Sequence, residues 1–342
     1  MFGGEILKKQ QRVLTGITTS GTPHLGNLVG AILPAIEASL DEDTASFLFL
    51  ADYHSLIKNK DSELTHNSSF EIAACWLACG LDPTKVIFYR QSDIPHIFEL
   101  AWILSCLTSK GLLNRAHAYK AAIADNEELG IKDQDKGITM GLFNYPVLMA
   151  ADILMFNADS VPVGQDQKQH IEMARDIALK FNHHYGELLT PPEAQISEVT
   201  GILPGIDGRK MSKSYNNTIP IFSDEKTLKK SVMKIKTNSL EPGEPKDTKD
   251  CNLFSIYKTI ASDAEIEDLK KRYQDGIGWG DAKNILFESL HDFLTPFNAE
   301  YENIIKDKSY VESVLIEGAT KAKEFSQPLI EEIRKSVGIK GF

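Results

Sequence analysis

Two short polar segments, far apart in the chain, carry side chains suited to phosphate chemistry. The first runs from Thr18 to Asn27, reads TTSGTPHLGN, and joins a β-rich run to an amphipathic stretch. At such a strand-to-helix turn, the N–H groups and the dipole of the helix N-terminus favour anions. His24 and Asn27 can donate hydrogen bonds to phosphoryl oxygens, and Gly26 lets a ribose or a flat ring approach the backbone. The segment is compatible with a nucleotide site; a plain turn with a solvated histidine is the alternative.

The second segment is the loop Lys210–Ser214, which reads KMSKS and which we call the lysine loop. It lies in a polar stretch rich in turn-forming residues. Lysine is a flexible cation that can follow negative charge from one phosphate to the next. Positive charge already in place where negative charge develops is usually the largest catalytic contribution. Taken alone, such a pentamer is usually a solvated basic loop, but its combination with the first segment favours a catalytic role.

A carboxylate inside an apolar stretch is the third candidate. Met149–Phe156 reads MAADILMF, with Asp152 within it. A buried carboxylate is costly unless it is paired. We therefore expect Asp152 to form an ion pair, to lie on a helix surface, or to accept a hydrogen bond from a ligand. The chain has no recognisable Ser–His–Asp set for nucleophilic catalysis.

Composition excludes several classes of protein. The chain has 342 residues, of which 42% are hydrophobic and 25% charged, as in ordinary globular proteins of one large or two joined domains. A net charge of −11 argues against a whole-surface nucleic-acid binder, although a local basic patch remains compatible with it. No apolar run approaches the roughly 18 residues of a membrane helix, and none follows the N-terminal lysines. We expect a cytoplasmic protein with neither a membrane span nor a signal peptide.

The four cysteines, Cys75, Cys79, Cys106 and Cys251, are too few and too widely spaced for a zinc or iron–sulfur site. We expect free thiols and no metal bound by the protein itself.

The elements that must position these residues alternate in type along the first 200 residues. Strands are predicted over Arg12–Ile17, Ser46–His54, Lys85–Arg90 and Ser160–Gly164. Apolar residues at helical spacing follow the first strand, with Pro34 expected to kink that helix, and a second helix is predicted to end before Gly80. This alternation indicates a Rossmann-like α/β fold with a parallel sheet covered on both faces.

The character of the chain changes after about Pro204. Two polar loops come first, and from Leu253 onward only helical periodicity is visible. We predict a Rossmann-like catalytic domain over 1–205, a linker with the lysine loop over 206–220, and an all-helical region over 221–342. The last helices of that region are expected to pack back on the catalytic domain.

With these motifs the chain resembles the class I aminoacyl-tRNA synthetases, whose paired motifs read HIGH and KMSKS; here the first reads HLGN. It looks most like the tryptophanyl-tRNA synthetases of bacterial and organellar type. The resemblance covers nearly the whole length, in the blocks GNLVGA (26–31), YPVLMAADIL (145–154), VPVGQDQKQHIE (161–172), RKMSKS (209–214), GIGWGDAK (276–283) and GATKAK (318–323).

The resemblance implies activation of tryptophan by ATP and its transfer to tRNA(Trp), in protein synthesis. It implies a homodimer, Mg²⁺ carried by the nucleotide, and tRNA or anticodon binding by the helical region. Helix Pro95–Ser109 with Trp102 is a candidate interface between copies, and a core role for Trp102 is equally compatible with its sequence.

Residue roles follow from the same resemblance. The catalytic residues would be His24, Asn27, Lys210, Lys213 and Ser214. ATP would contact Thr18, Ser20, Gly26, Asn27, Gly164, Asp166, Gln167, Lys210, Met211, Ser212 and Lys213. Tryptophan would contact Leu14, His54, Tyr145, Met149, Asp152, Val161, Val163 and Gln167. Asp152 would accept the indole N–H, whereas Tyr145 and Gln167 would hold the ammonium group. The chain departs from the family in having Gln165 where members usually carry Glu, and Leu14 where many carry Phe.

Three other functions remain as alternatives. A tyrosyl-tRNA synthetase shares the motifs, but its relatives read more like GSDQWGN where this chain has GQDQKQH. A non-catalytic paralogue that only binds tryptophan or RNA would not need an intact lysine loop. A small-molecule nucleotidylyltransferase with an HxGH turn is usually shorter and lacks the helical region.

Overall fold

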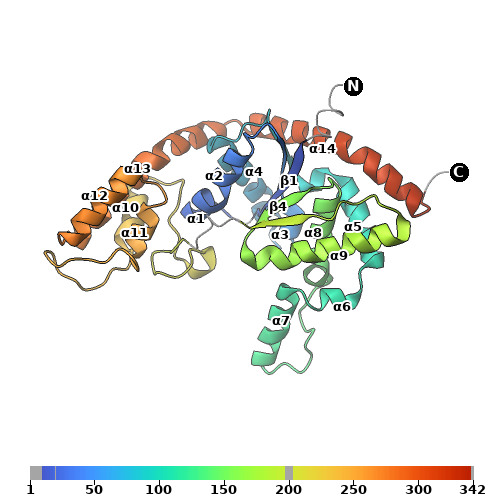
Figure 1. Ribbon diagram of the computed structural model, residues 1–342, viewed down its shortest axis with the longest axis horizontal. Coiled ribbons are helices and arrows are strands. Elements are labelled where there is room, and N and C mark those ends of the chain that lie inside the picture. Colours follow the sequence, from blue (N-terminus) through green and yellow to red (C-terminus); the bar gives the residue numbers. More distant parts are fainter. Residues whose placement is uncertain (1–9, 20, 197–202, 340–342) are drawn as a thin grey trace.

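A parallel sheet forms the centre of the first half of the chain in the computed structural model, which describes residues 10–19, 21–196 and 203–339 (Figure 1). Within these residues the strands are β1 (Gln11–Ile17), β2 (Thr44–Leu50), β3 (Ile87–Arg90), β4 (Ser160–Val163) and β5 (Glu193–Ile196). They are ordered β3-β2-β1-β4-β5, and every pairing is parallel. The chain leaves β1 in one direction for β2 and β3, and β4 and β5 lie on the other side. Ligands of such sheets bind at the carboxyl ends of the strands flanking this reversal, here β1 and β4.

The predicted α/β fold is therefore confirmed, with two differences in the strands. The second strand ends at Leu50, because Asp52–Ser55 forms a separate helical turn, α3. Sequence analysis extended this strand to His54, since the apolar run gives no signal of where the sheet edge lies. Strand β5 was not predicted: EAQI is a largely exposed edge strand without a hydrophobic pattern.

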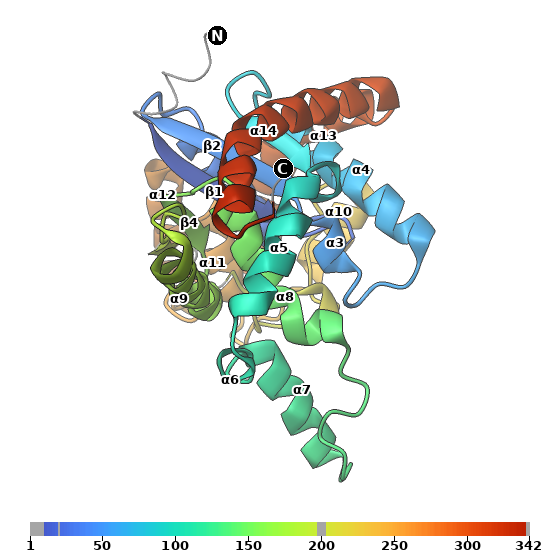
Figure 2. The same cartoon turned by 90° about the vertical axis from the view of Figure 1, so that its right-hand side faces the viewer.

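Helices cover both faces of the sheet. The helices of the first 196 residues are α1 (Leu25–Asn27), α2 (Leu33–Ala38), α3 (Asp52–Ser55), α4 (Ser62–Ala78), α5 (Pro95–Leu107), α6 (Lys110–Leu113), α7 (His117–Glu128), α8 (Met140–Leu154) and α9 (Lys168–Tyr185). One core cluster joins α1, α2 and α4 to one face of the sheet, and a second joins α5, α8 and α9 to the other. Helix α7 projects away from the sheet in both views (Figures 1 and 2).

The interruption expected at Pro34 is a π-helical turn, Leu28–Ile32, between α1 and α2. The N–H of Leu33 donates to the carbonyl of Leu28, five residues earlier. Proline has no N–H for the regular bond, so the helix changes its hydrogen-bond pattern at this point. The second predicted helix ends where expected: α4 is followed by Gly80 with a φ of +99°.

The last part of the chain is helical from Leu253 onward within the described residues, as predicted. Its helices, with the one that precedes Leu253, are α10 (Glu225–Met233), α11 (Asn252–Tyr257), α12 (Asp263–Gln274), α13 (Trp279–Ile304) and α14 (Lys308–Ser336). Helices α10 to α13 share one core cluster with α4 and one face of the sheet. The domain boundaries at 205 and 220 stay a prediction, since this core is continuous across them.

Helix α14 runs from the helical end of the molecule back over the edge of the sheet (Figure 1). It packs against β3 so closely that a Cβ at Gly318 would lie 1.7 Å from the carbonyl oxygen of Phe88. Farther along, Arg334 forms an ion pair with Glu99 of α5, with 2.5 Å between nitrogen and oxygen. The C-terminal helix is thus part of the layer that supports the sheet. Among the described residues, no helix has the length and apolar character required to cross a membrane.

Candidate active site

The lysine loop folds against the turn that follows β1. The backbone N–H of Gly26 donates to Sδ of Met211, at 3.4 Å. A Cβ on Gly21, which has a φ of +65°, would lie 3.0 Å from Nζ of Lys213. Beyond the loop, the carbonyl of Ile219 accepts from the N–H of Leu25 at 2.9 Å. The two segments selected from the sequence therefore meet, and one of the two lysines lies over the first turn.

His24 caps the first helical turn together with Asn27. Nδ1 of His24 accepts from the backbone N–H of Asn27, and Oδ1 of Asn27 accepts from the backbone N–H of His24. Burial, and secondarily the charge of Lys213, lower the pKa of His24 to about 4. The ring is therefore neutral near pH 7. Because Nδ1 acts as an acceptor, Nε2 carries the proton and can serve as a donor to a ligand.

Apart from Ser20 and the side chain of Asp166, the remaining residues predicted to bind ATP lie at the carboxyl ends of β1 and β4 or on the lysine loop. Thr18 follows β1, and Gly164 and Gln167 follow β4, with Thr18 and Gln167 exposed. Within the loop, Lys210 and Ser214 are exposed and Ser212 is half-buried. Ser20 and the side chain of Asp166 lie outside the described residues. Burial lowers the pKa of Lys213, and the nearby Glu71 opposes this shift.

The carboxylate of Asp152 is completely buried in α8 and has two partners from other elements. Its Oδ2 accepts from Nε2 of His54 in α3 at 2.8 Å, and its Oδ1 accepts from Nε2 of Gln91 at 2.8 Å. Burial raises the pKa of Asp152, and both hydrogen bonds oppose this rise. Asp152 is thus paired within the protein by hydrogen bonds with His54 and Gln91, and it does not lie on a helix surface. A carboxylate offers about four acceptor positions, so a further donor from a ligand is compatible with this geometry.

Gln91 is a site residue that the sequence analysis missed. It is fully buried in a short 3-10 turn, Gln91–Asp93, directly after β3. Its Oε1 accepts from the backbone N–H of Tyr53 at 3.2 Å, which fixes the amide with its NH₂ toward Asp152. The available signal was its position: a polar residue at the carboxyl end of a parallel strand, where ligands of this fold bind.

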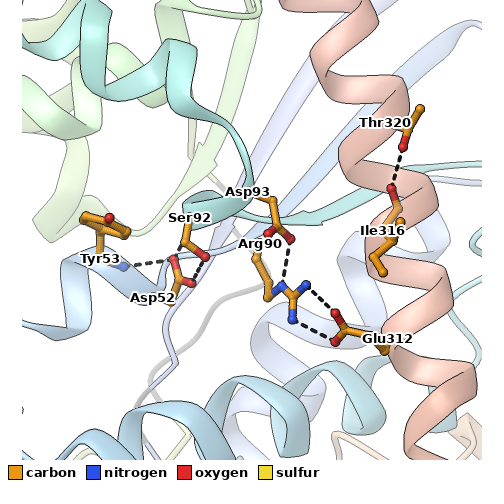
Figure 3. A network of polar contacts seen from close by, with 8 residues as sticks. All are labelled: Asp52, Tyr53, Arg90, Ser92, Asp93, Glu312, Ile316 and Thr320. Atoms are coloured by element: carbon orange, nitrogen blue, oxygen red, sulfur yellow. Dashed lines mark hydrogen bonds and ion pairs between the residues drawn. The ribbon is translucent and has the colours of Figure 1, made fainter.

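The segments that carry His54 and Gln91 are also held by a second network of polar contacts, made by Asp52, Tyr53, Arg90, Ser92, Asp93 and Glu312 (Figure 3). Asp52 accepts hydrogen bonds from the hydroxyl of Ser92 and from the backbone N–H of Tyr53. Arg90 pairs with Asp93 at 2.8 Å and with Glu312 of α14 at 2.7 Å. Gln91 and His54 thus turn toward Asp152, whereas their sequence neighbours Asp52, Arg90, Ser92 and Asp93 form a separate polar network.

Tyr145 lies to one side of the Asp152 group, which consists of Asp152, His54 and Gln91. Its hydroxyl is hydrogen-bonded to Nε2 of His170 in α9. Its ring is edge-on to that of His54, with 6.5 Å between centroids. Burial raises the pKa of Tyr145 to about 12, so the phenol stays protonated. His170 was not selected from the sequence, although it lies in the same GQDQKQH block as Gln167.

The apolar residues predicted to surround the amino acid belong to the core beneath α8. Leu14, Val161 and Val163 are buried there, and Met149 is partly buried against them. Gly16 follows Leu14 on the same face of β1, and a Cβ on it would lie 3.1 Å from the ring of Phe49. These residues form the floor between the sheet and α8, directly beside the polar group around Asp152.

A cavity of about 1000 Å³ lies on the outer side of this network, between α4, the end of β3 and the start of α14. It contains none of the residues predicted from the sequence, and its wall includes Asp52, Arg90, Ser92 and Glu312. Among the described residues there is no cluster of three or more His, Cys, Asp or Glu side chains placed to hold a metal ion.

The site combines a cationic loop against a strand-to-helix turn with a buried carboxylate in α8, and the chain is similar to known proteins over most of its length. The family model of class I tRNA synthetases for W and Y matches residues 7–295. A tryptophan–tRNA ligase of Neisseria meningitidis serogroup A is 54% identical over 331 residues, covering 97% of this chain and 98% of that protein. The chain belongs to the tryptophan–tRNA ligase family. This confirms the family and the enzyme class predicted from the motifs: a class I aminoacyl-tRNA synthetase.

Two further relatives of the family agree. The tryptophan–tRNA ligase of Xanthomonas axonopodis pv. citri is 56% identical over 331 residues, which cover 96% of this chain and 76% of that protein. A crystal structure of tryptophanyl-tRNA synthetase from Campylobacter jejuni, complexed with ADP and tryptophan, is 43% identical with a TM-score of 0.87. It covers 96% of this chain and all of that one. These identities favour the tryptophan family over the tyrosine family, which the class model does not separate.

Proposed function

We propose that this chain activates tryptophan with ATP and transfers it to tRNA(Trp), at the site formed by the lysine loop, the first turn and the Asp152 group. The observation that carries the proposal is that the lysine loop lies against the turn after β1. Sδ of Met211 accepts from the N–H of Gly26 at 3.4 Å, and Nζ of Lys213 lies 3.0 Å from where a Cβ on Gly21 would stand. A cation thus lies where β1 ends, at the edge of the sheet where ligands of this fold bind. The ligand set of the Campylobacter jejuni structure supports the same assignment.

In the first step the tryptophan carboxylate attacks the α-phosphorus of ATP, and pyrophosphate leaves. Such chemistry depends on positioning and on stabilisation of charge rather than on a covalent nucleophile. Lys213 and Lys210 lie on the loop that would follow the charge developing on pyrophosphate. Neutral His24 would donate from Nε2 to a phosphoryl oxygen, and Thr18, Gly26 and Ser212 would contact the nucleotide. Magnesium would arrive with ATP and neutralise its phosphates.

In the second step a ribose hydroxyl of the tRNA attacks the carbonyl carbon of tryptophanyl-adenylate, and AMP leaves. The basic helix α10, with Lys226, Lys229 and Lys230 exposed, is a candidate contact for tRNA phosphates within the helical region.

The amino acid would be selected beside α8. Asp152 would accept the indole N–H, since indole offers one donor and no acceptor. Tyr145 and Gln167 would hold the ammonium group. The apolar floor beneath would exclude water from the indole ring.

The active form would be a homodimer. Trp102 of α5 is 72% exposed, so a core role is wrong for it within one chain. A large aromatic side chain exposed to this degree suits an interface between two copies of the chain.

The test is ATP–pyrophosphate exchange with each of the standard amino acids in turn, followed by charging of tRNA. We expect exchange with tryptophan alone and charging of tRNA(Trp). Exchange with tyrosine would favour the tyrosyl alternative. Tryptophan binding without exchange would favour a non-catalytic paralogue, and exchange that requires no amino acid would contradict an amino-acid ligase.

A further inference from the structure

We propose that Asn217 is a positioning residue that holds the lysine loop in the shape that places Lys213 over the first turn. This inference rests on the proposed function of the loop. Asn217 follows the loop by three residues and is only 1% exposed, although the loop itself is at the surface. A fully buried amide in such a place is retained only where its polar atoms are paired.

The side chain of Asn217 is bonded to both sides of the loop. Its Oδ1 accepts from the backbone N–H of Ser212 at 2.8 Å. Its Nδ2 donates to the carbonyl of Lys210 at 3.0 Å and to Oδ1 of Asp207 at 2.7 Å. The two bonds to the loop backbone flank Met211, the residue that contacts Gly26. One side chain thus fixes the backbone on either side of the contact between the two motifs.

This pattern requires an amide. Asparagine supplies two N–H donors and a carbonyl acceptor on one short side chain. Aspartate in its place would have no donor for the carbonyl of Lys210 and would put a second carboxylate against Asp207. Alanine would leave the N–H of Ser212 and the carbonyl of Lys210 without this partner.

The neighbouring backbone is shaped to receive the same side chain. A Cβ on Gly205 would lie 2.4 Å from the amide carbon and nitrogen of Asn217, so only glycine fits. The N–H of Ile206 donates to the backbone carbonyl of Asn217 at 2.9 Å. The residues before the lysine loop, Gly205 and Ile206, therefore contact Asn217, which follows the loop.

Asp207 extends this closure outward. Arg209 is paired with it, with 2.7 Å between nitrogen and oxygen, and the guanidinium lies 4.3 Å from the ring centroid of Tyr215. The hydrogen bond from Asn217, with Arg209 contributing, lowers the pKa of Asp207 to about 2, so this carboxylate is charged at any working pH. Asp207 before the lysine loop and Asn217 after it are thus bonded to each other without any ligand.

A loop held in this way has already lost the conformational freedom that it would otherwise lose during the reaction. Misplacement of a catalytic group by about 1 Å can cost on the order of a hundredfold in rate. The structure assigns to Asn217 the prevention of that misplacement for Lys213.

The experiment compares Asn217→Ala with the matched control Asn303→Ala, an exposed asparagine near the end of α13. We expect Asn217→Ala to slow single-turnover adenylate formation about 10- to 100-fold. The Kd for tryptophan without ATP should change less than twofold, since Asn217 is bonded to Asp207, Lys210 and Ser212 and not to Asp152, His54 or Gln91 in the described part of the chain. Asn303→Ala should leave both quantities unchanged. An unchanged rate in Asn217→Ala would overturn the proposal.

A double-mutant cycle separates positioning from general damage. If Asn217 acts by placing Lys213, Lys213→Ala should slow an Asn217→Ala background by a smaller factor than it slows the wild type. Equal factors in both backgrounds would contradict the proposal. Asp207→Ala, which removes one acceptor while keeping Asn217, should give a smaller rate loss, and it tests the same cycle if Asn217→Ala folds poorly.

Hydrogen–deuterium exchange of the lysine loop tests the inference apart from the proposed function. The amide of Ser212 should exchange faster in Asn217→Ala and at the wild-type rate in Asn303→Ala. Unchanged protection of the Ser212 amide would contradict the positioning role of Asn217. A wild-type protein without tryptophan-dependent exchange of pyrophosphate would instead contradict the proposed function and leave the structural claim to this measurement.

Discussion

The Asp152 group supplies the buried carboxylate of the site and the lysine loop its cations, and the two regions are held in different ways. Asp152 is completely buried, and its partners come from α3 and from the turn after β3, far from it in sequence. The lysine loop is exposed and is held by bonds among residues 203–217. A buried charge needs long-range partners because it cannot use water, whereas an exposed loop needs only a defined backbone. Substitutions in the first region should therefore affect stability as well as substrate choice, and those in the second should affect rate.

The largest expected effect comes from the loop. If Lys213 stabilises charge on the departing pyrophosphate, Lys213→Ala should reduce the rate of adenylate formation about a hundredfold or more. Tryptophan affinity and the melting temperature should change little, because the side chain is at the surface. Single-turnover kinetics measure the rate of adenylate formation, and calorimetry measures the tryptophan affinity and the melting temperature. The matched control is Lys226→Ala on α10, which should keep the wild-type rate. Equal rates for the two variants would remove Lys213 from the catalytic step.

Asp152→Ala should affect both properties at once. A hydrogen bond to a charged group contributes roughly 1.5–3 kcal/mol, so kcat/KM for tryptophan should fall roughly 10- to 150-fold, with little change in ATP binding. Discrimination against phenylalanine should narrow, because the acceptor that penalises a substrate without a donor is gone. The free energy of unfolding should also fall by about 1–3 kcal/mol for each donor left unpaired, on His54 and Gln91.

The exposed Asp176 of α9 provides the control for this substitution, since Asp176→Ala should change neither activity nor stability. Pyrophosphate exchange with tryptophan and with phenylalanine measures kcat/KM and the discrimination between them. Chemical denaturation measures the free energy of unfolding. Wild-type kcat/KM for tryptophan in Asp152→Ala would show that this carboxylate serves the core alone.

The two regions also differ in how far the sequence predicted them. The lysine loop could be identified because its chemistry is concentrated in five consecutive residues, and that of HLGN in four. The Asp152 group could be found only in part. His54 and Asp152 were selected, but Gln91 and His170 were not, because their roles depend on which elements the fold brings together: the turn after β3 with α8, and α9 with α8. Asn217 was missed for another reason: its bonds to the loop are to backbone atoms of Lys210 and Ser212, which leave no pattern of paired side chains in the sequence.

The fold shows the same division. The four longer or apolar strands and the helical second half could be predicted from local periodicity. The edge strand β5 could not, because its residues are exposed, and the end of β2 could not, because an apolar run does not record where a sheet stops. The close approach of α14 to β3 at Gly318 depends on residues more than 200 positions apart and has no local signal.

A smaller effect is expected from Gln91, which holds Asp152 without being predicted to touch the substrate. Gln91→Met keeps the approximate volume and removes the donor, so the carboxylate loses one of its two partners in the structure. We expect kcat/KM for tryptophan to fall about tenfold through KM, because a single hydrogen bond to a charged group is lost. The exposed Gln195 on β5 gives the control Gln195→Met. A loss confined to kcat, or equal behaviour of the two variants, would contradict a role in orienting Asp152.

The smallest expected effect is a shift in the titration of His24, and it joins the lysine loop to the first turn directly. Burial and the charge of Lys213 lower the pKa of His24 from 6.5 to about 4. The unfolded chain therefore binds more protons than the folded one between these two values. The contribution of His24 to the free energy of unfolding is fully present above pH 6.5 and is lost as the pH falls toward 4. Lys213→Ala should raise the pKa of His24 part of the way back, since burial remains, and Lys226→Ala should leave it unchanged. The pKa of His24 can be measured in the wild type, Lys213→Ala and Lys226→Ala by following its Cε1–H resonance by NMR across pH 3.5–8. A wild-type midpoint near 6.5, or the same midpoint in Lys213→Ala, would mean that in solution the lysine loop does not lie against the turn.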